Sequence, residues 1–163
     1  VARSIDRSVE MINALKSSSQ RHIPRKPSIL YMLRDYYRVR RKLKRYNVHN
    51  ILSIPDSSDM RHRYSLEMIS FVATSCWNAS EGLLLSTYAI RGLEATLDYG
   101  FAEAFPFSLF VLVVSTFGDL HLSFDVGRMT TSLVSRCTSV QDKLKSLILV
   151  HLWTMLDVPI HNH

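Results

Sequence analysis

The stretch FAEAFPFSLFVLVVSTFGDL, residues 101–120, decides the fold class of this chain. Its segment 105–114 is apolar apart from one serine, and acidic residues, Glu103 and Asp119, bracket it. A membrane-spanning helix needs about 20 apolar residues, so this segment is too short to cross a bilayer. Pro106 falls in a first helical turn, where its missing N–H costs little. The stretch therefore predicts a buried central helix without a membrane span.

Apolar residues recur at three- and four-residue steps on both sides of this helix, which is the period of an amphipathic helix. The helices expected from this period begin near Tyr64, Ser80, Ala102, Leu120 and Val140. We expect structural turns at Gly100, Gly118 and Asp119, because glycine ends helices and aspartate caps them. Gly92 and Gly127 lie inside expected helices, where close approach of a neighbouring helix would explain them.

The expected helix starts recur about every twenty residues, so a two-helix unit spans roughly 40, between the tetratricopeptide and HEAT periods. The sequence therefore predicts an all-α fold. Its antiparallel helix pairs are expected to stack as a tetratricopeptide-like right-handed superhelix. In such an array the last helix lacks a neighbour, so we expect an exposed apolar face around 147–155 and marginal stability.

The chain divides into three expected parts. Residues 1–47 form a helical lead-in: a short helix over 5–17, a polar loop, and a second helix that begins near Ser28 and carries Leu30, Leu33 and Tyr37 on one apolar face. Residues 48–63 form a linker rich in turn residues. Residues 64–163 form the repeat array.

Composition places the chain among ordinary globular proteins, since 47% of its 163 residues are hydrophobic and 21% are charged. The sequence begins at Val1 and shows no signal peptide, so we expect a fragment of a larger protein. Its two cysteines, Cys76 and Cys137, lack the spacing of a metal site. We expect both to be buried thiols in a reducing compartment, and therefore a cytoplasmic protein.

A basic block lies at the end of the second expected helix. Its members are Arg38, Arg40, Arg41, Lys42, Lys44 and Arg45, and they equal the whole net charge of +6. Such a block is typical of a polyanion site, of a contact with an acidic partner protein, or of a solvated surface. Because no nucleic-acid fold signature accompanies it, nucleic acid is not the favoured partner.

Catalytic and metal-binding patterns are not found. Neither His161 with His163 nor His121 with His151 has the spacing of a metal site, and His151 is expected as a hydrogen-bonded core residue. The sequence contains no GxSxG, no P-loop and no GxGxxG. We therefore expect no catalytic residue, no metal and no cofactor within this fragment.

The order of several motifs resembles a known arrangement. The motifs are the basic helix, Asn50-Ile51-Leu52-Ser53-Ile54-Pro55-Asp56, Leu97-Asp98-Tyr99-Gly100, Phe117-Gly118-Asp119 and Phe124-Asp125-Val126-Gly127-Arg128. Over residues 40–163 the chain resembles the helical region that follows the predicted AAA-type ATPase module of large multidomain sensor histidine kinases. In that family, sensory GAF and histidine-kinase domains follow the helical region.

This resemblance implies a role in two-component signal transduction. The segment would be a non-catalytic connector whose partners are mainly flanking domains of the same chain, and whose parent is a histidine kinase that binds ATP elsewhere. None of the family's catalytic residues lies in this fragment. The alternative is a free-standing helical-repeat adaptor that binds a partner protein or a polyanion through residues 38–45.

Overall fold

The computed structural model describes residues 2–15 and 22–157, and within these ranges its regular structure is helical. The helices are α1 (Ala2–Leu15), α2 (Ile29–Leu43), α3 (Met60–Asn78), α4 (Gly82–Tyr99), α5 (Phe105–Thr116), α6 (Leu120–Val134) and α7 (Val140–Asp157), with a 3-10 turn η1 (Ile51–Ser53) between α2 and α3. One isolated parallel bridge joins Asp56 to Phe101. The prediction of an all-α fold is confirmed for the described ranges.

Helix boundaries follow the capping residues. Both α6 and α7 begin at the predicted residues, and Asp119 caps α6 by accepting a hydrogen bond from the N–H of Leu122 at 3.3 Å. By contrast, α3 begins at Met60, earlier than expected, because Asp59 accepts a hydrogen bond from the N–H of Arg61 at 2.8 Å and caps the helix there. The first turn of α3 thus lies within the predicted linker.

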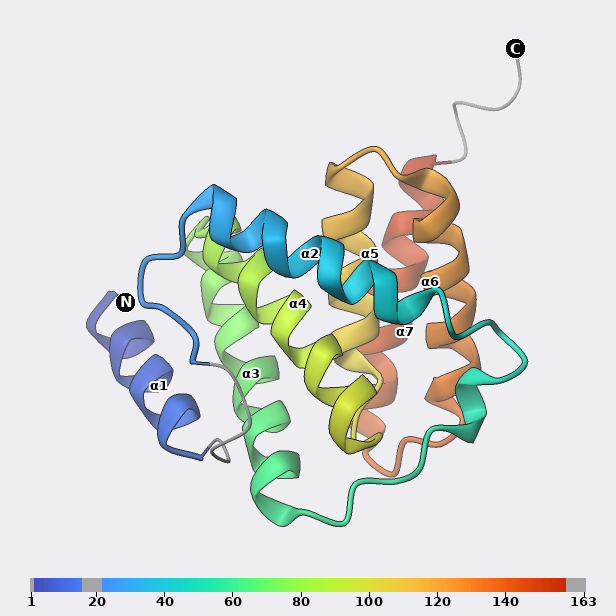
Figure 1. Cartoon of the computed structure of the whole chain (residues 1–163), viewed down its shortest axis with the longest axis horizontal. Helices are drawn as coiled ribbons and strands as arrows, with labels where there is room; N and C mark the ends of the chain where they lie inside the picture. Colours follow the sequence, from blue (N-terminus) through green and yellow to red (C-terminus); the bar gives the residue numbers. More distant parts are fainter. Residues whose placement is uncertain (1, 16–21, 158–163) are drawn as a thin grey trace.

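The helix α5 occupies the centre of the molecule (Figure 1). It packs against α4, α6 and α7 and touches α3, whereas α1 packs on the outer side of α3 and α2 lies across α4. Nearly every side chain of α5 is buried, including Phe107 and Phe110. The predicted buried central helix is therefore confirmed. Gly92 of α4 permits this packing, because a Cβ at its position would lie 3.1 Å from Cβ of Pro106.

The lead-in helices share the core of the later helices. Tyr36 of α2 stacks on Phe110 of α5, with ring centroids 5.9 Å apart, and Val39 is fully buried beside it. The predicted apolar face of α2 was wrong at two of its three positions, since Leu30 is 80% exposed and Tyr37 is 59% exposed, whereas Leu33 packs against the core. The face of α2 that packs inward includes the buried Asp35. A charged residue interrupts the apolar period on that face, so the sequence did not indicate it.

The linker is held against the turn between α4 and α5. The N–H of Ser57 donates to the carbonyl of Phe101, and the N–H of Phe101 donates to the carbonyl of Pro55, both at 2.8 Å. Gly100 makes this approach possible, because its φ is +104° and a Cβ there would lie 2.8 Å from the Pro55 oxygen.

Arg136, between α6 and α7, closes over the same turn. Its guanidinium donates to the carbonyls of Leu52 at 3.1 Å and Ile54 at 2.7 Å, pairs with Asp56, and stands 4.6 Å from the ring centroid of Phe101. We call this group the Arg136 clamp. It joins the linker to the far end of the helical array.

Candidate protein-interaction site

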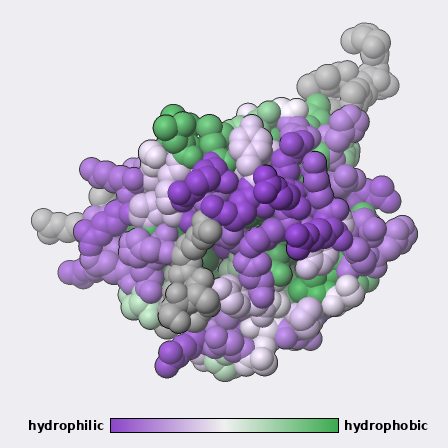
Figure 2. All heavy atoms as spheres, in the orientation of Figure 1, coloured by the Kyte–Doolittle hydropathy of each residue, from purple (hydrophilic) through white to green (hydrophobic). Residues whose placement is uncertain are grey.

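The structure divides the predicted basic block into two sets (Figure 2 shows hydrophilic side chains gathered on the face that α2 crosses). The inner set forms ion pairs: Arg38 with Asp35 at 2.8 Å, Arg40 with Asp119 at 2.6 Å, and Lys42 with Asp98 at 2.5 Å. The outer set, Arg41, Lys44 and Arg45, is exposed and forms no ion pair within the described part of the chain. Among the described residues, therefore, the outer set is the part of the basic block whose charge is not paired.

A buried charge network joins α2 to α4. Nη2 of Arg91 lies 2.6 Å from Oδ2 of Asp35, and Nη1 of Arg91 donates to Glu94 at 2.8 Å. Both Arg91 and Asp35 are at least 96% buried, with 4% and 2% of their side chains exposed. Burial alone would raise the pKa of Glu94, but Arg91, Lys42 and Arg38 together lower it. These ion pairs hold α2 against α4, while Nε of Arg91 is buried without a hydrogen-bond partner among the described residues.

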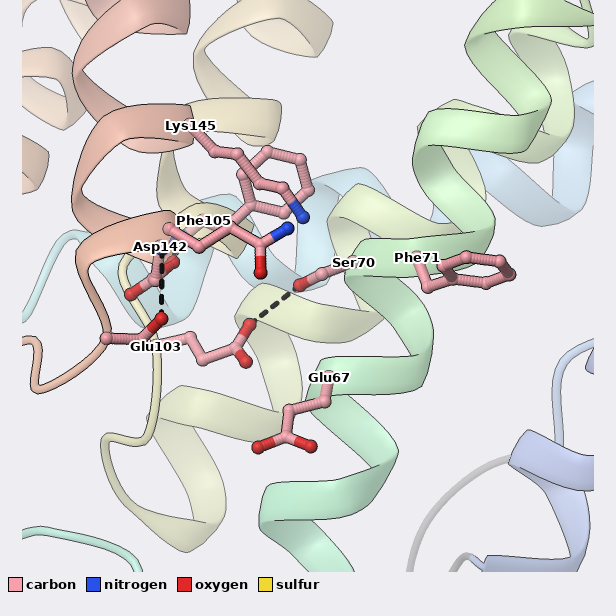
Figure 3. A pocket seen from close by; sticks show the side chains of 9 residues that line it. Glu67, Ser70, Phe71, Glu103, Phe105, Asp142 and Lys145 are labelled. Atoms are coloured by element: carbon pink, nitrogen blue, oxygen red, sulfur yellow. Dashed lines mark hydrogen bonds between the residues drawn. The ribbon is translucent and has the colours of Figure 1, made fainter.

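A polar pocket of about 380 Å³ lies between α3 and α7, beside the N-terminus of α5 (Figure 3). Glu67 and Ser70 enter it from α3, Glu103 from the turn before α5, and Asp142 and Lys145 from α7. These residues come from three distant segments, and only their own helices could be predicted from sequence. No spacing pattern in the sequence predicts the pocket.

Two carboxyls of this pocket differ in role. Asp142 is buried and accepts hydrogen bonds from the N–H groups of Ala104 at 3.0 Å and Phe105 at 3.1 Å, so it caps α5 from another helix. Glu103 accepts a hydrogen bond from Oγ of Ser70 at 2.7 Å. Burial raises the pKa of Glu103 to about 7, so this carboxyl takes up and releases a proton near neutral pH.

Both cysteines are free and buried. Burial raises the pKa of Cys76 to about 11 and that of Cys137 to about 12. Each thiol is therefore protonated at neutral pH and is a poor nucleophile.

The outer face of α7 is apolar. Its exposed side chains are Val140 (70% exposed), Leu144 (55%), Leu147 (43%), Ile148 (55%) and Leu152 (51%), which we call the α7 seam. The expected apolar face of the last helix is thus present as far as Leu152, while the side chain of Met155 lies outside the described residues. His151 is exposed on the same face, so its predicted place in the core was wrong.

Trp77, at the end of α3, marks a second apolar surface. It is 59% exposed and borders a pocket of about 430 Å³, whose floor includes Leu112 and Val113 of α5. This pocket is separate from the α7 seam, because no residue of α7 lines it.

His121 is exposed on α6, and His161 and His163 lie outside the described residues. Within residues 2–15 and 22–157, His, Cys, Asp and Glu side chains form no group of three or more that could hold a metal ion. In the same ranges, no helix is both long enough and apolar enough to cross a membrane.

Comparison with protein-family models, curated proteins and solved structures finds no match to this chain.

Proposed function

We propose that this chain is a non-catalytic helical connector that binds another protein segment through the α7 seam. The observation that carries the proposal is the exposure of Leu144, Leu147 and Ile148 on one helical face. Soluble proteins seldom expose a contiguous apolar patch of this kind without a partner that covers it.

The tetratricopeptide-like arrangement is part of the same proposal. Consecutive helices α3 with α4, and α5 with α6, pack as pairs, and α7 packs on both α5 and α6. In this arrangement α7 is the first helix of a further pair. A helix laid on the seam would then complete the pair, as each unit of a repeat array covers its neighbour.

The proposed signalling context rests on the order of sequence motifs over residues 40–163 that resembles the helical region of sensor histidine kinases. We propose a cytoplasmic connector, within a sensor histidine kinase, between an ATPase module and a downstream kinase. The two buried, free thiols fit a reducing compartment. Sequencing the surrounding reading frame tests this context: a P-loop upstream and a histidine-kinase core downstream are expected, and stop codons close to both ends would contradict it.

Site-specific crosslinking tests the use of the seam. In one variant, expressed in the host cell, a photo-crosslinking residue replaces Leu147. In a control variant the same residue replaces Leu30, which is also exposed but lies on α2. We expect Leu147 to label one defined segment, of the same chain or of another protein, and Leu30 not to label it. Labelling at Leu147 that equals labelling at Leu30, or that survives Leu144→Ser with Ile148→Ser, would refute the proposal.

A second function is favoured by the outer basic set. Arg41 lies in the last turn of α2, and Lys44 and Arg45 follow its end. None of the three has an ion-pair partner in the described chain, so they are available to a polyanion or an acidic protein. Heparin retention across a salt gradient tests this, since contacts with polyanions weaken as salt rises.

The matched variants for that test remove equal charge. Changing Arg41, Lys44 and Arg45 to Gln is expected to abolish most of the retention. The same change at exposed Arg61, Arg63 and Arg128 is expected to leave most of it. Equal retention of the two triple variants would remove residues 38–45 as a binding site.

A further inference from the structure

We propose that the α7 seam accepts one amphipathic helix whose apolar stripe is flanked by acidic side chains. This inference rests on the proposed function, and it specifies the chemistry of the partner. Val140, Leu144, Leu147 and His151 follow one another at steps of four, three and four residues, which is the spacing of the inner positions of a coiled coil. Ile148 and Leu152 widen the same stripe.

Charge on α7 favours an acidic partner. Lys143 and Lys145 lie on different sides of the seam, since two positions on a helix are about 200° apart. Between Val140 and Leu152 the one acid is Asp142, which is buried and already bonded to the N-terminus of α5. The outer surface of this part of α7 therefore carries positive charge and no exposed negative charge.

Lys143 and Lys145 are half-buried on either side of the seam, and Lys145 also lines the polar pocket close to Glu103. Neither forms an ion pair within the described residues. The ammonium of Lys145 lies 5.7 Å from the ring centroid of Phe105 at the edge of the polar pocket (Figure 3). Glutamates that flank the stripe of a docked helix would pair with such lysines, as flanking residues do in coiled coils.

A second copy of this chain fits the seam less well. Two seams packed against each other would bring Lys143 and Lys145 of both copies to one interface that contains no exposed acid from α7. Each copy also carries a net charge of +6. Like charges at an interface oppose association, so the seam is better matched to an acidic helix than to itself.

Two designed helical peptides of about 21 residues, three heptads long, test this. Both carry Leu at the inner positions; the acidic probe carries Glu at the flanking positions and the basic probe carries Lys there. Each is labelled and titrated with the whole chain by fluorescence anisotropy. We expect the acidic probe to bind at least about tenfold more tightly than the basic probe, and to weaken as salt rises.

Variants of the chain locate the contact. Leu144→Ser with Leu147→Ser is expected to weaken the acidic probe at least about tenfold. Lys143→Glu with Lys145→Glu is expected to reverse the preference between the probes. As a matched control, Arg41→Glu with Lys44→Glu changes the charge equally on α2 and should leave the order of the probes unchanged. Circular dichroism and urea unfolding verify that each variant is folded.

Three results would overturn the inference. The first is equal binding of the two probes. The second is loss of acidic-probe binding in Trp77→Ser but not in the seam variants. The third is a dimer of the chain, seen by sedimentation, that dissociates in the variant Leu144→Ser with Leu147→Ser. If crosslinking from Leu147 finds a partner segment while the probes show no charge preference, the proposed function stands and this inference fails. If crosslinking and probe binding both fail, neither stands.

Discussion

The carboxylate of Asp142, near the start of α7, accepts a hydrogen bond from the N–H of Phe105, the first residue of α5, at 3.1 Å. Ala104, the residue before it, donates to the other carboxylate oxygen at 3.0 Å. The residues just before α5 thus supply no side-chain cap, and α5 is capped instead by a residue of α7, which follows it in the sequence.

Removing this cap should destabilise the whole fold. We expect Asp142→Ala to lower the free energy of unfolding by about 1–2 kcal/mol, because two N–H groups at a helix N-terminus lose their acceptor. Urea unfolding measures this change. Exposed Asp125 on α6 provides the control, and Asp125→Ala should change the free energy by less than about 0.5 kcal/mol. Equal effects of the two variants would contradict the capping role.

The ion pair between Asp35 and Arg91 should be costly to break from one side. We expect Arg91→Met to lower the free energy of unfolding by about 3–5 kcal/mol, because the buried Asp35 carboxylate loses its buried partner and is left to the more exposed Arg34 and Arg38. Changing both residues, with Asp35→Leu added, should recover most of that loss. Thermal unfolding of the three proteins checks this, and a double variant that is no more stable than Arg91→Met would count against the explanation.

Gly100 and Gly82 form a matched pair for the close turn. Gly100→Ala should cost roughly 1–3 kcal/mol, because its φ is +104° and the new Cβ would meet the Pro55 oxygen at 2.8 Å. A Cβ at Gly82 would meet no surrounding side chain or neighbouring segment within 4 Å, so Gly82→Ala should be neutral or slightly stabilising. Denaturant unfolding measures the stability of the two variants. Similar losses of stability would show that the turn at Gly100 does not exclude a side chain.

The stability of the chain should fall as pH rises toward neutrality through Glu103. Its pKa is raised from 4.5 to about 7 in the folded state, so folding favours the protonated carboxyl. That contribution is complete below about pH 4.5 and is lost as pH rises through about 7, at up to about 1.4 kcal/mol per pH unit. Urea unfolding between pH 5.5 and pH 8 should show a smaller decline for Glu103→Gln, and parallel curves would contradict the shift.

Tyr88 is fully buried, and its hydroxyl has no hydrogen-bond partner among the described residues. Tyr88→Phe should therefore raise the free energy of unfolding by up to about 1 kcal/mol, because the variant no longer buries an unbonded hydroxyl. Exposed Tyr37 supplies the control, and Tyr37→Phe should have almost no effect. A loss of stability in Tyr88→Phe would mean that the hydroxyl is bonded after all.

The helical period and the capping residues carried most of the fold prediction. In α3, Leu66, Ile69, Val72 and Cys76 recur at steps of three and four residues, and all four are buried. Local signals suffice there, because spacing along one helix determines which side chains share a face. The start of α6 follows from Asp119 in the same way.

Contacts between distant segments escaped prediction. The inner face of α2 depends on Arg91, which lies in another helix and makes a buried Asp35 stable. Nothing in the spacing of α2 reveals that partner, so the more apolar face with Leu30 was chosen. The polar pocket was missed for the same reason, since Glu103 and Asp142 meet only after α5 and α7 pack. The exposure of the α7 seam, by contrast, was predicted as far as Leu152, because the last helix of a repeat array has no neighbour to cover it.

The Arg136 clamp has a consequence for how the chain unfolds. Its hydrogen bonds and ion pair join residues 80 to 84 positions apart in the sequence, across helices α3 to α6. In an open repeat array, melting can start at an end and advance one unit at a time. Here α3 to α6 lie inside a loop that the clamp closes, so their amide hydrogens should exchange with solvent in a single cooperative event rather than in succession.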